Sequence, residues 1–196
     1  MATKLPTVAI IGRANAGKSS LFNRMMRSQQ AIVAREAGTT RDRVVGKAAY
    51  HGHEFWLVDT AGLKPAEDEF EASIQEQITD ASDAADVILV VVDSTEYPSD
   101  EDRRVAKTAL KSRKPVILIA NKTDLRGSLP TSEFLRLGIK SIIRTSAEHN
   151  SGISDALDEI CQHIPEKRQA EPSDVLKIAL IGRPNVGKSS LFNTLA

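Results

Sequence analysis

Short apolar runs alternate along the chain with longer segments of helical period. Most of the apolar runs are rich in Val and Ile, as buried strands are. Strands that alternate with helices predict βα units on a mostly parallel sheet, with helices on both of its faces. The expected strands are Thr7–Ile11, Arg43–Tyr50, Glu54–Asp59, Asp86–Asp93, Pro115–Asn121 and Lys140–Ser146. The expected helices are Lys18–Met26, Phe70–Ala84, Ser99–Ser112, Thr131–Leu137 and Ser154–Ile164.

The same pattern starts again near the end of the chain. Residues 8–23 and 178–193 are identical at twelve of sixteen positions when they are aligned with an offset of 170. Between them, the polar segment PEKRQAEPSD is flanked by prolines and predicts a linker. A lone strand and a helix of about two turns cannot form a domain. We therefore expect a complete domain at 1–166, a linker at 167–175 and a truncated start of a second domain at 176–196.

Composition narrows the class of protein. The 196 residues are 41% apolar, which suits one complete domain of roughly 100 to 200 residues. Lysine plus arginine equals aspartate plus glutamate at 26 each, so no global field recruits DNA or a membrane, and any RNA contact must be local. The longest apolar run, Val87–Val92, is far shorter than the ~20 residues that cross a bilayer. We expect a soluble, cytoplasmic protein.

The segment GRANAGKSS lies between an expected strand and an expected helix, as a phosphate-binding P-loop requires. Its glycines allow backbone N–H groups and the helix N-terminus to face phosphates. We expect Lys18 to balance charge on the β- and γ-phosphates and the Ser19 hydroxyl to hold Mg²⁺. The residues of this loop expected at the nucleotide are Gly12, Ala14, Asn15, Ala16, Gly17, Lys18, Ser19 and Ser20.

The segment NKTD, Asn121 to Asp124, follows a buried strand at the edge where ligands bind in open α/β sheets. The Asp124 carboxylate can accept hydrogen bonds from N1–H and N2–H₂ of guanine, an edge that adenine lacks. We expect Lys122 to lay its stem along the base. In TSAEH, Ser146 and Ala147 complete the set, with the Ala147 N–H offered to guanine O6. The motifs therefore predict GTP and GDP as ligands.

The segment DTAG follows the strand EFWLVD and supplies Asp59 to the magnesium shell. Gly62 can bring its N–H close to the γ-phosphate because it has no side chain. In AGTTRD, Thr40 is expected to close over Mg²⁺ when the γ-phosphate is present, with Thr39 as the less favoured alternative. Such a segment orders with GTP and relaxes after hydrolysis.

These five motifs, in this order over residues 8–150, look like a translation-factor-class GTPase. The chain resembles the Der/EngA tandem GTPases in its second P-loop and in the residues of its five motifs, which read GR-N-GKSSLFN, GTTRDR, VDTAGL, NKTDL and SAEH-SGI. The resemblance implies an α/β P-loop NTPase G domain with a six-stranded sheet, and hydrolysis of GTP to GDP and phosphate. It also implies a role in large ribosomal subunit biogenesis in bacteria, with rRNA contacted mainly through domains absent here. Ala14 departs from the family, which usually has proline there.

The residue after Gly62 is Leu63, which cannot orient water as the glutamine of Ras-like enzymes does. In similar GTPases, the P-loop asparagine that matches Asn15 helps to bind K⁺. The resemblance therefore implies that Asn15 and carbonyls before Gly38 bind K⁺, which stabilises charge in the transition state. The residues expected to be catalytic are Lys18, Asn15, Thr40 and Gly62.

Two other functions stay open at this stage. One is a tRNA-modification GTPase resembling MnmE, which shares the motifs but not the repeat. The other is a GTP-dependent binding module, which would have the same nucleotide site but would hydrolyse GTP slowly. No switch threonine, DTAG or NKxD follows the second P-loop, Gly182 to Ser189. We therefore expect one specific GTP site per chain.

Overall fold

A six-stranded sheet forms the centre of the computed structural model, which describes residues 5–27, 44–59, 81 and 84–165. The strand order is β2-β3-β1-β4-β5-β6, and only the β2–β3 pair is antiparallel. The predicted mostly parallel sheet of six strands is thereby confirmed. The strands are β1 (Thr7–Ile11), β2 (Val44–Tyr50), β3 (His53–Asp59), β4 (Val87–Asp93), β5 (Val116–Asn121) and β6 (Ser141–Arg144).

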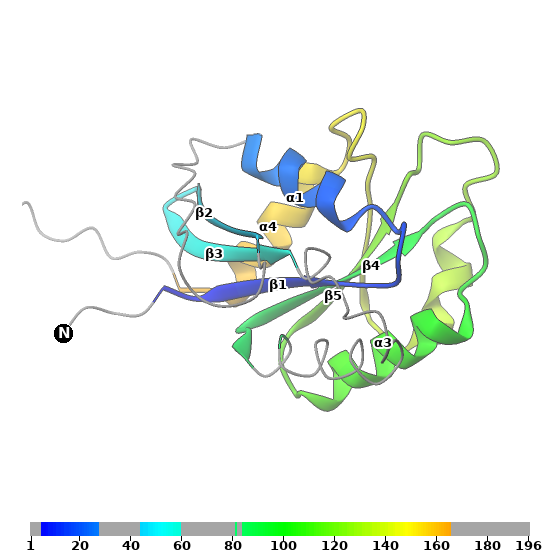
Figure 1. Ribbon diagram of the computed structural model, residues 1–196, viewed down its shortest axis with the longest axis horizontal. Coiled ribbons are helices and arrows are strands. Elements are labelled where there is room, and N and C mark those ends of the chain that lie inside the picture. The colour runs from blue at the N-terminus through cyan, green and yellow to red at the C-terminus, as the bar shows by residue number, and fades with distance from the viewer. Residues whose placement is uncertain (1–4, 28–43, 60–80, 82–83, 166–196) are drawn as a thin grey trace, which may run out of the picture.

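Helices cover both faces of the sheet, as Figure 1 shows. Helices α1 (Lys18–Arg27) and α4 (Ile153–His163) pack on one face, and α3 (Asp100–Lys111) lies on the other with the 3₁₀ helix η2 (Thr131–Leu137). Each face has its own apolar core: Met25 and Leu157 belong to the first, and Phe134 to the second. Strand β4 is buried along its whole length because both faces are covered. The prediction of helices on both faces is confirmed.

Local backbone chemistry explains where several elements begin and end. His51 and Gly52 both have positive φ, 46° and 85°, which is the geometry of a two-residue hairpin turn between β2 and β3. Helix α3 is capped by Ser99, whose hydroxyl accepts a hydrogen bond from the Asp102 N–H. Gly138, with φ 79°, ends η2. The expected helix Phe70–Ala84 lies largely outside the described residues.

The expected helix Thr131–Leu137 is confirmed and has 3₁₀ geometry, whereas the expected end of the last strand is wrong. Strand β6 ends at Arg144 rather than Ser146. Ser146 leaves the sheet because its backbone exchanges hydrogen bonds with Ser151 across a turn.

The parallel topology places four strand ends together. Because β1, β3, β4 and β5 all run in one direction, their carboxyl ends meet at one edge of the sheet. The residues at those ends are Gly12, directly after β1, and Asp59, Asp93 and Asn121. Ligands bind at this edge in open α/β sheets.

Among the described residues, no helix is long and apolar enough to cross a membrane.

Candidate functional site

The loop between β1 and α1 adopts a backbone that favours its glycines. Gly12, Asn15 and Gly17 have positive φ values of 153°, 60° and 91°. A Cβ on Gly12 would lie 2.3 Å from the carbonyl oxygen of Val91, and one on Gly17 would lie 2.3 Å from Asn121 Nδ2. The loop therefore approaches β4 and β5 more closely than any larger residue would allow.

Lys18 lies inside this loop, at the first position of α1. Its ammonium donates hydrogen bonds to the carbonyl oxygens of Gly12, at 2.8 Å, and Arg13, at 2.7 Å, and the residue is 7% exposed. Burial lowers the pKa of Lys18, and the nearby negative charges of Asp59 and Glu101 partly oppose that shift. The cation is thus held beside the loop backbone, where it can meet a phosphate group.

The N-terminus of α1 suits an anion. The first turn of this helix contains no acidic residue, so the positive end of its dipole is not neutralised there. Ser19 and Ser20 in that turn are exposed, and Asp59 at the end of β3 is buried. A hydroxyl and a carboxylate are oxygen ligands that Mg²⁺ accepts together with phosphate oxygens and water. Among the described residues, no group of three His, Cys, Asp or Glu side chains is placed to hold a metal by itself.

Asn121 joins three parts of the site. Its Nδ2 donates to the carbonyl oxygen of Ala16 in the P-loop, at 3.3 Å. Its Oδ1 accepts hydrogen bonds from the Thr145 hydroxyl, at 3.1 Å, and from the Ala147 N–H, at 3.2 Å. The sequence predicts that the Ala147 N–H donates to guanine O6, whereas in the structure it donates to Asn121 Oδ1. The asparagine therefore fixes the positions of the P-loop and the 145–149 segment relative to β5.

Lys122 and Asp93 form an ion pair beside the same edge. Lys122 has φ 66°, and its ammonium lies 2.6 Å from Asp93 Oδ2. Burial acts to raise the pKa of Asp93, but hydrogen bonds from Lys122 and from the side chain and N–H of Thr95 lower it overall. The pair anchors the end of the lysine side chain, so that its aliphatic stem is available to a flat ligand. Asp93 carries no motif in the sequence and was not predicted.

A hollow of about 230 Å³ lies between the P-loop and the 145–149 segment. Its lining comprises Gly17, Ser20, Asn121, Lys122, Asp124, Leu125, Ala147 and Glu148, and all of these except Leu125 and Glu148 were predicted from the sequence to bind the nucleotide. A hydrogen bond with the Ser146 side chain lowers the pKa of Asp124, against a smaller opposing effect of desolvation. The Asp124 carboxylate is therefore ionised at neutral pH and acts only as an acceptor.

Arg24 is a positioning residue that was not predicted from the sequence. From the middle of α1, its Nε donates to the carbonyl oxygen of Ala147 and its Nη2 to that of Glu148, each at 2.6 Å. The guanidinium thus connects the helix that follows the P-loop to the wall of the hollow, 123 residues further along the chain. No short motif signals such a contact.

Arg13, also in the P-loop, is held toward α3. Its guanidinium forms an ion pair of 2.6 Å with Glu96 and lies 3.5 Å from the buried carboxylate of Asp102. Several predicted residues lie outside the described ranges: Thr39, Thr40, Gly62 and the second P-loop, Gly182 to Ser189.

Comparisons with known proteins agree with this geometry. The family profile described as 50S ribosome-binding GTPase matches residues 7–122 and 177–196. GTPase Der of Gemmatimonas aurantiaca is 45% identical over 194 residues, and GTPase Der of Desulforamulus reducens is 45% identical over 191. Each match covers 97% of this chain but 44% of the relative, so the chain spans less than half the length of these relatives. The inferred resemblance to Der is confirmed.

Solved structures share the fold. A variant of Era from Aquifex aeolicus, bound to GDP and AlF₄⁻, has a TM-score of 0.65 and 29% identity, and the match covers 91% of this chain and 63% of that one. The G domain of T. maritima FeoB has a TM-score of 0.61 and 25% identity, with 82% of this chain and 99% of that one covered. The predicted α/β P-loop fold is confirmed.

Replacing Asn121 with alanine should destabilise the fold. The buried Thr145 hydroxyl and Ala147 N–H would lose their acceptor, which costs about 1 to 3 kcal/mol for each buried polar group left unpaired. We expect urea unfolding to report a loss of about 2 to 6 kcal/mol for Asn121→Ala, because two such groups lose their acceptor. Asn23→Ala, which alters an exposed asparagine on α1, is the matched control and should change the free energy of unfolding little. Equal stability of the two variants would contradict the role of Asn121.

Replacing Arg24 with alanine should loosen the 147–148 wall of the hollow. Hydrogen bonds from a charged donor contribute about 1.5 to 3 kcal/mol, so we expect release of a fluorescent GDP analogue to accelerate about tenfold. Arg24→Lys keeps the charge but lacks the planar fork that spans two carbonyls, and should also release GDP faster. Arg27→Ala, on the last turn of the same helix, should release it at the wild-type rate. Unchanged release from both Arg24 variants would refute this role.

Proposed function

The chain belongs to the family of 50S ribosome-binding GTPases, and we therefore propose that it binds GTP and hydrolyses it to GDP and phosphate. The observation that carries this proposal is the set of hydrogen bonds by which Asn121 joins Ala16 of the P-loop to Thr145 and Ala147, which we call the Asn121 junction. It holds a loop suited to phosphates and a hollow suited to a guanine base in one rigid arrangement. Der relatives share 45% identity with this chain, which supports a switch that acts in large-subunit biogenesis in the bacterial cytoplasm.

Guanine is the base that the hollow favours. Asp124 is ionised and acceptor-only, and it faces the same hollow as Lys122 and Ala147. A carboxylate here accepts hydrogen bonds from guanine N1–H and N2–H₂, whereas adenine would leave it unpaired. The stem of Lys122 supplies an apolar surface for the face of the base.

The Asp124→Asn variant tests this assignment directly. An amide at this position can donate to the C2 carbonyl of xanthine but repels the N2–H₂ group of guanine. We expect GDP affinity to fall about a hundredfold or more and affinity for xanthosine diphosphate to rise, both measured by calorimetry. A variant that keeps its preference for GDP would contradict the assignment, and wild-type binding of ADP as tight as GDP would contradict the function.

Phosphate binding and hydrolysis are assigned to the P-loop and its neighbours. Lys18 neutralises charge on the β- and γ-phosphates, and the α1 N-terminus adds backbone N–H donors. Ser19, Asp59 and Thr40 would hold Mg²⁺, which when bound neutralises charge on the phosphate oxygens. Gly62 would place its N–H at the γ-phosphate. The roles of Thr40 and Gly62 follow from their motifs alone.

Asn15 is the residue that we assign to the binding of K⁺. It is exposed in the P-loop and held with φ 60°, and Leu63 leaves the chain without a glutamine after Gly62. A cation beside the phosphates would supply the charge that an arginine finger supplies elsewhere. The family resemblance, rather than any contact of Asn15, supports this choice.

Hydrolysis should therefore depend on the monovalent cation. We expect the rate of phosphate release to be higher in KCl than in NaCl of equal ionic strength, and Asn15→Ala to lose about a hundredfold of the rate in KCl. Fluorescent GDP binding by the same variant serves as the control for folding. Equal rates in both salts, with Asn15→Ala no slower, would exclude the K⁺ role.

The organisation of the chain belongs to the same proposal. The proposed organisation is a G domain at 1–166 that holds a specific GTP site, a linker at 167–175 and the opening of a second G domain at 176–196. The family profile recurs at 177–196, which supports the repeat.

Single-turnover hydrolysis with and without 50S subunits separates a GTPase switch from a binding module with slow turnover. Persistent bound GTP under both conditions would favour the binding module.

A further inference from the structure

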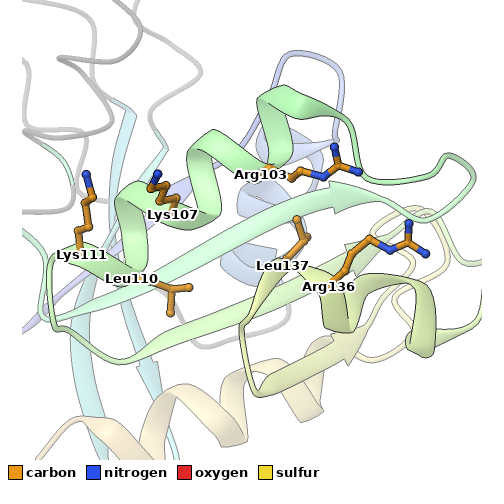
Figure 2. A pocket seen from close by; sticks show the side chains of 6 residues that line it. All are labelled: Arg103, Lys107, Leu110, Lys111, Arg136 and Leu137. Carbon is orange, nitrogen blue, oxygen red and sulfur yellow. The ribbon is translucent and has the colours of Figure 1, made fainter.

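A second hollow lies on the other face of the sheet, between α3 and η2 (Figure 2). Its volume is about 470 Å³, and it shares no lining residue with the hollow beside the P-loop. Six residues line it: Arg103, Lys107, Leu110 and Lys111 from α3, and Arg136 and Leu137 from η2. A molecule bound here would therefore leave the nucleotide site accessible.

Four of those six residues are cationic. Arg103, Lys107 and Lys111 follow one another at intervals of four residues, so they lie on one side of α3 about 6 Å apart along its axis. Figure 2 shows Lys107 and Lys111 extending to the same side of α3, while Arg136 extends from the η2 side. The chain as a whole has no net charge, so this cationic groove is a local feature.

Two of the four cations have acidic partners, and two do not. Arg103 pairs with Asp100 and Arg136 with Glu133, each at 2.6 Å, through exposed contacts that contribute little to stability. Within the part of the chain that the structure describes, Lys107 and Lys111 make no ion pair. A ligand with several negative charges would therefore gain most from the two lysines.

The floor of the groove helps to select the ligand. Leu137 is buried and Leu110 is 42% exposed, and the lining contains no aromatic ring on which a base could stack. A row of evenly spaced cations matches the repeating charge of a nucleic-acid strand, and the leucines can contact its sugars. An acidic protein segment would use the charges but needs deeper apolar pockets for its anchors than one buried leucine provides.

We propose that the groove between α3 and η2 binds the phosphate backbone of ribosomal RNA, without reading its sequence. This inference rests on the proposed function, because the 50S subunit is the source of that RNA. Backbone contacts of this kind release counterions, so binding weakens steeply as salt rises.

The test measures binding of the chain to protein-free large-subunit RNA, by filter binding across ~50 to 200 mM KCl. The Lys107→Gln/Lys111→Gln variant removes two charges from the groove. The matched control, Lys47→Gln/Arg27→Gln, removes two positive charges from β2 and α1, which lie away from α3. Removing two phosphate contacts should weaken binding about tenfold or more and lower the salt slope by about 1 to 2. The control should bind RNA as the wild type does.

Three outcomes would overturn the proposal. The first is a groove variant that binds RNA as tightly as the control does, and the second is a wild-type chain that does not bind RNA at all. Groove-dependent binding to 50S subunits without binding to protein-free RNA would assign the groove to an acidic protein segment instead. Fluorescent GDP binding is measured on every variant. If RNA binding depends on the groove but GDP does not bind, the proposed GTPase function fails while the RNA surface stands.

Discussion

The side-chain amide of Asn121 is almost completely buried, and it uses its donor and its acceptor at the same time. The donor reaches the P-loop at Ala16, and the acceptor holds Thr145 and Ala147. Polar groups without partners are costly in this setting, so each of the three segments has one low-energy position. The hollow that we assign to guanine exists because these segments are fixed relative to one another.

The topology of the sheet creates the need for this junction. Parallel strands bring their carboxyl ends to one edge, but the loops that leave those ends have no ladder to hold them. Side chains therefore provide the connections between loops. Arg24 attaches the 147–148 backbone to α1, and the ion pair of Lys122 with Asp93 attaches the NKTD segment to β4. The P-loop and the hollow beside it consequently form one unit with the sheet.

Sequence patterns were sufficient to predict the fold and to locate the motifs, because strand periodicity and glycine loops are local signals. Six strands, helices on both faces and the position of Asn121 and Asp124 were all predicted. Arg24 and Asp93 were not, because their roles depend on contacts with residues far away in the chain. The end of β6 was placed two residues too late because the Ser146 to Ser151 pairing has no sequence signature. Thr40, Gly62 and the domain boundaries stay predictions.

Hydrogen exchange at peptide resolution tests the Asn121 junction most directly, by comparing wild type with Asn121→Ala. If Asn121 joins the two loops, exchange should accelerate together at 12–20 and 145–149, while β1 and β4 keep their protection. Bound GDP should slow exchange in both loops in the wild type. Acceleration in only one of the two loops, or in neither, would contradict the account.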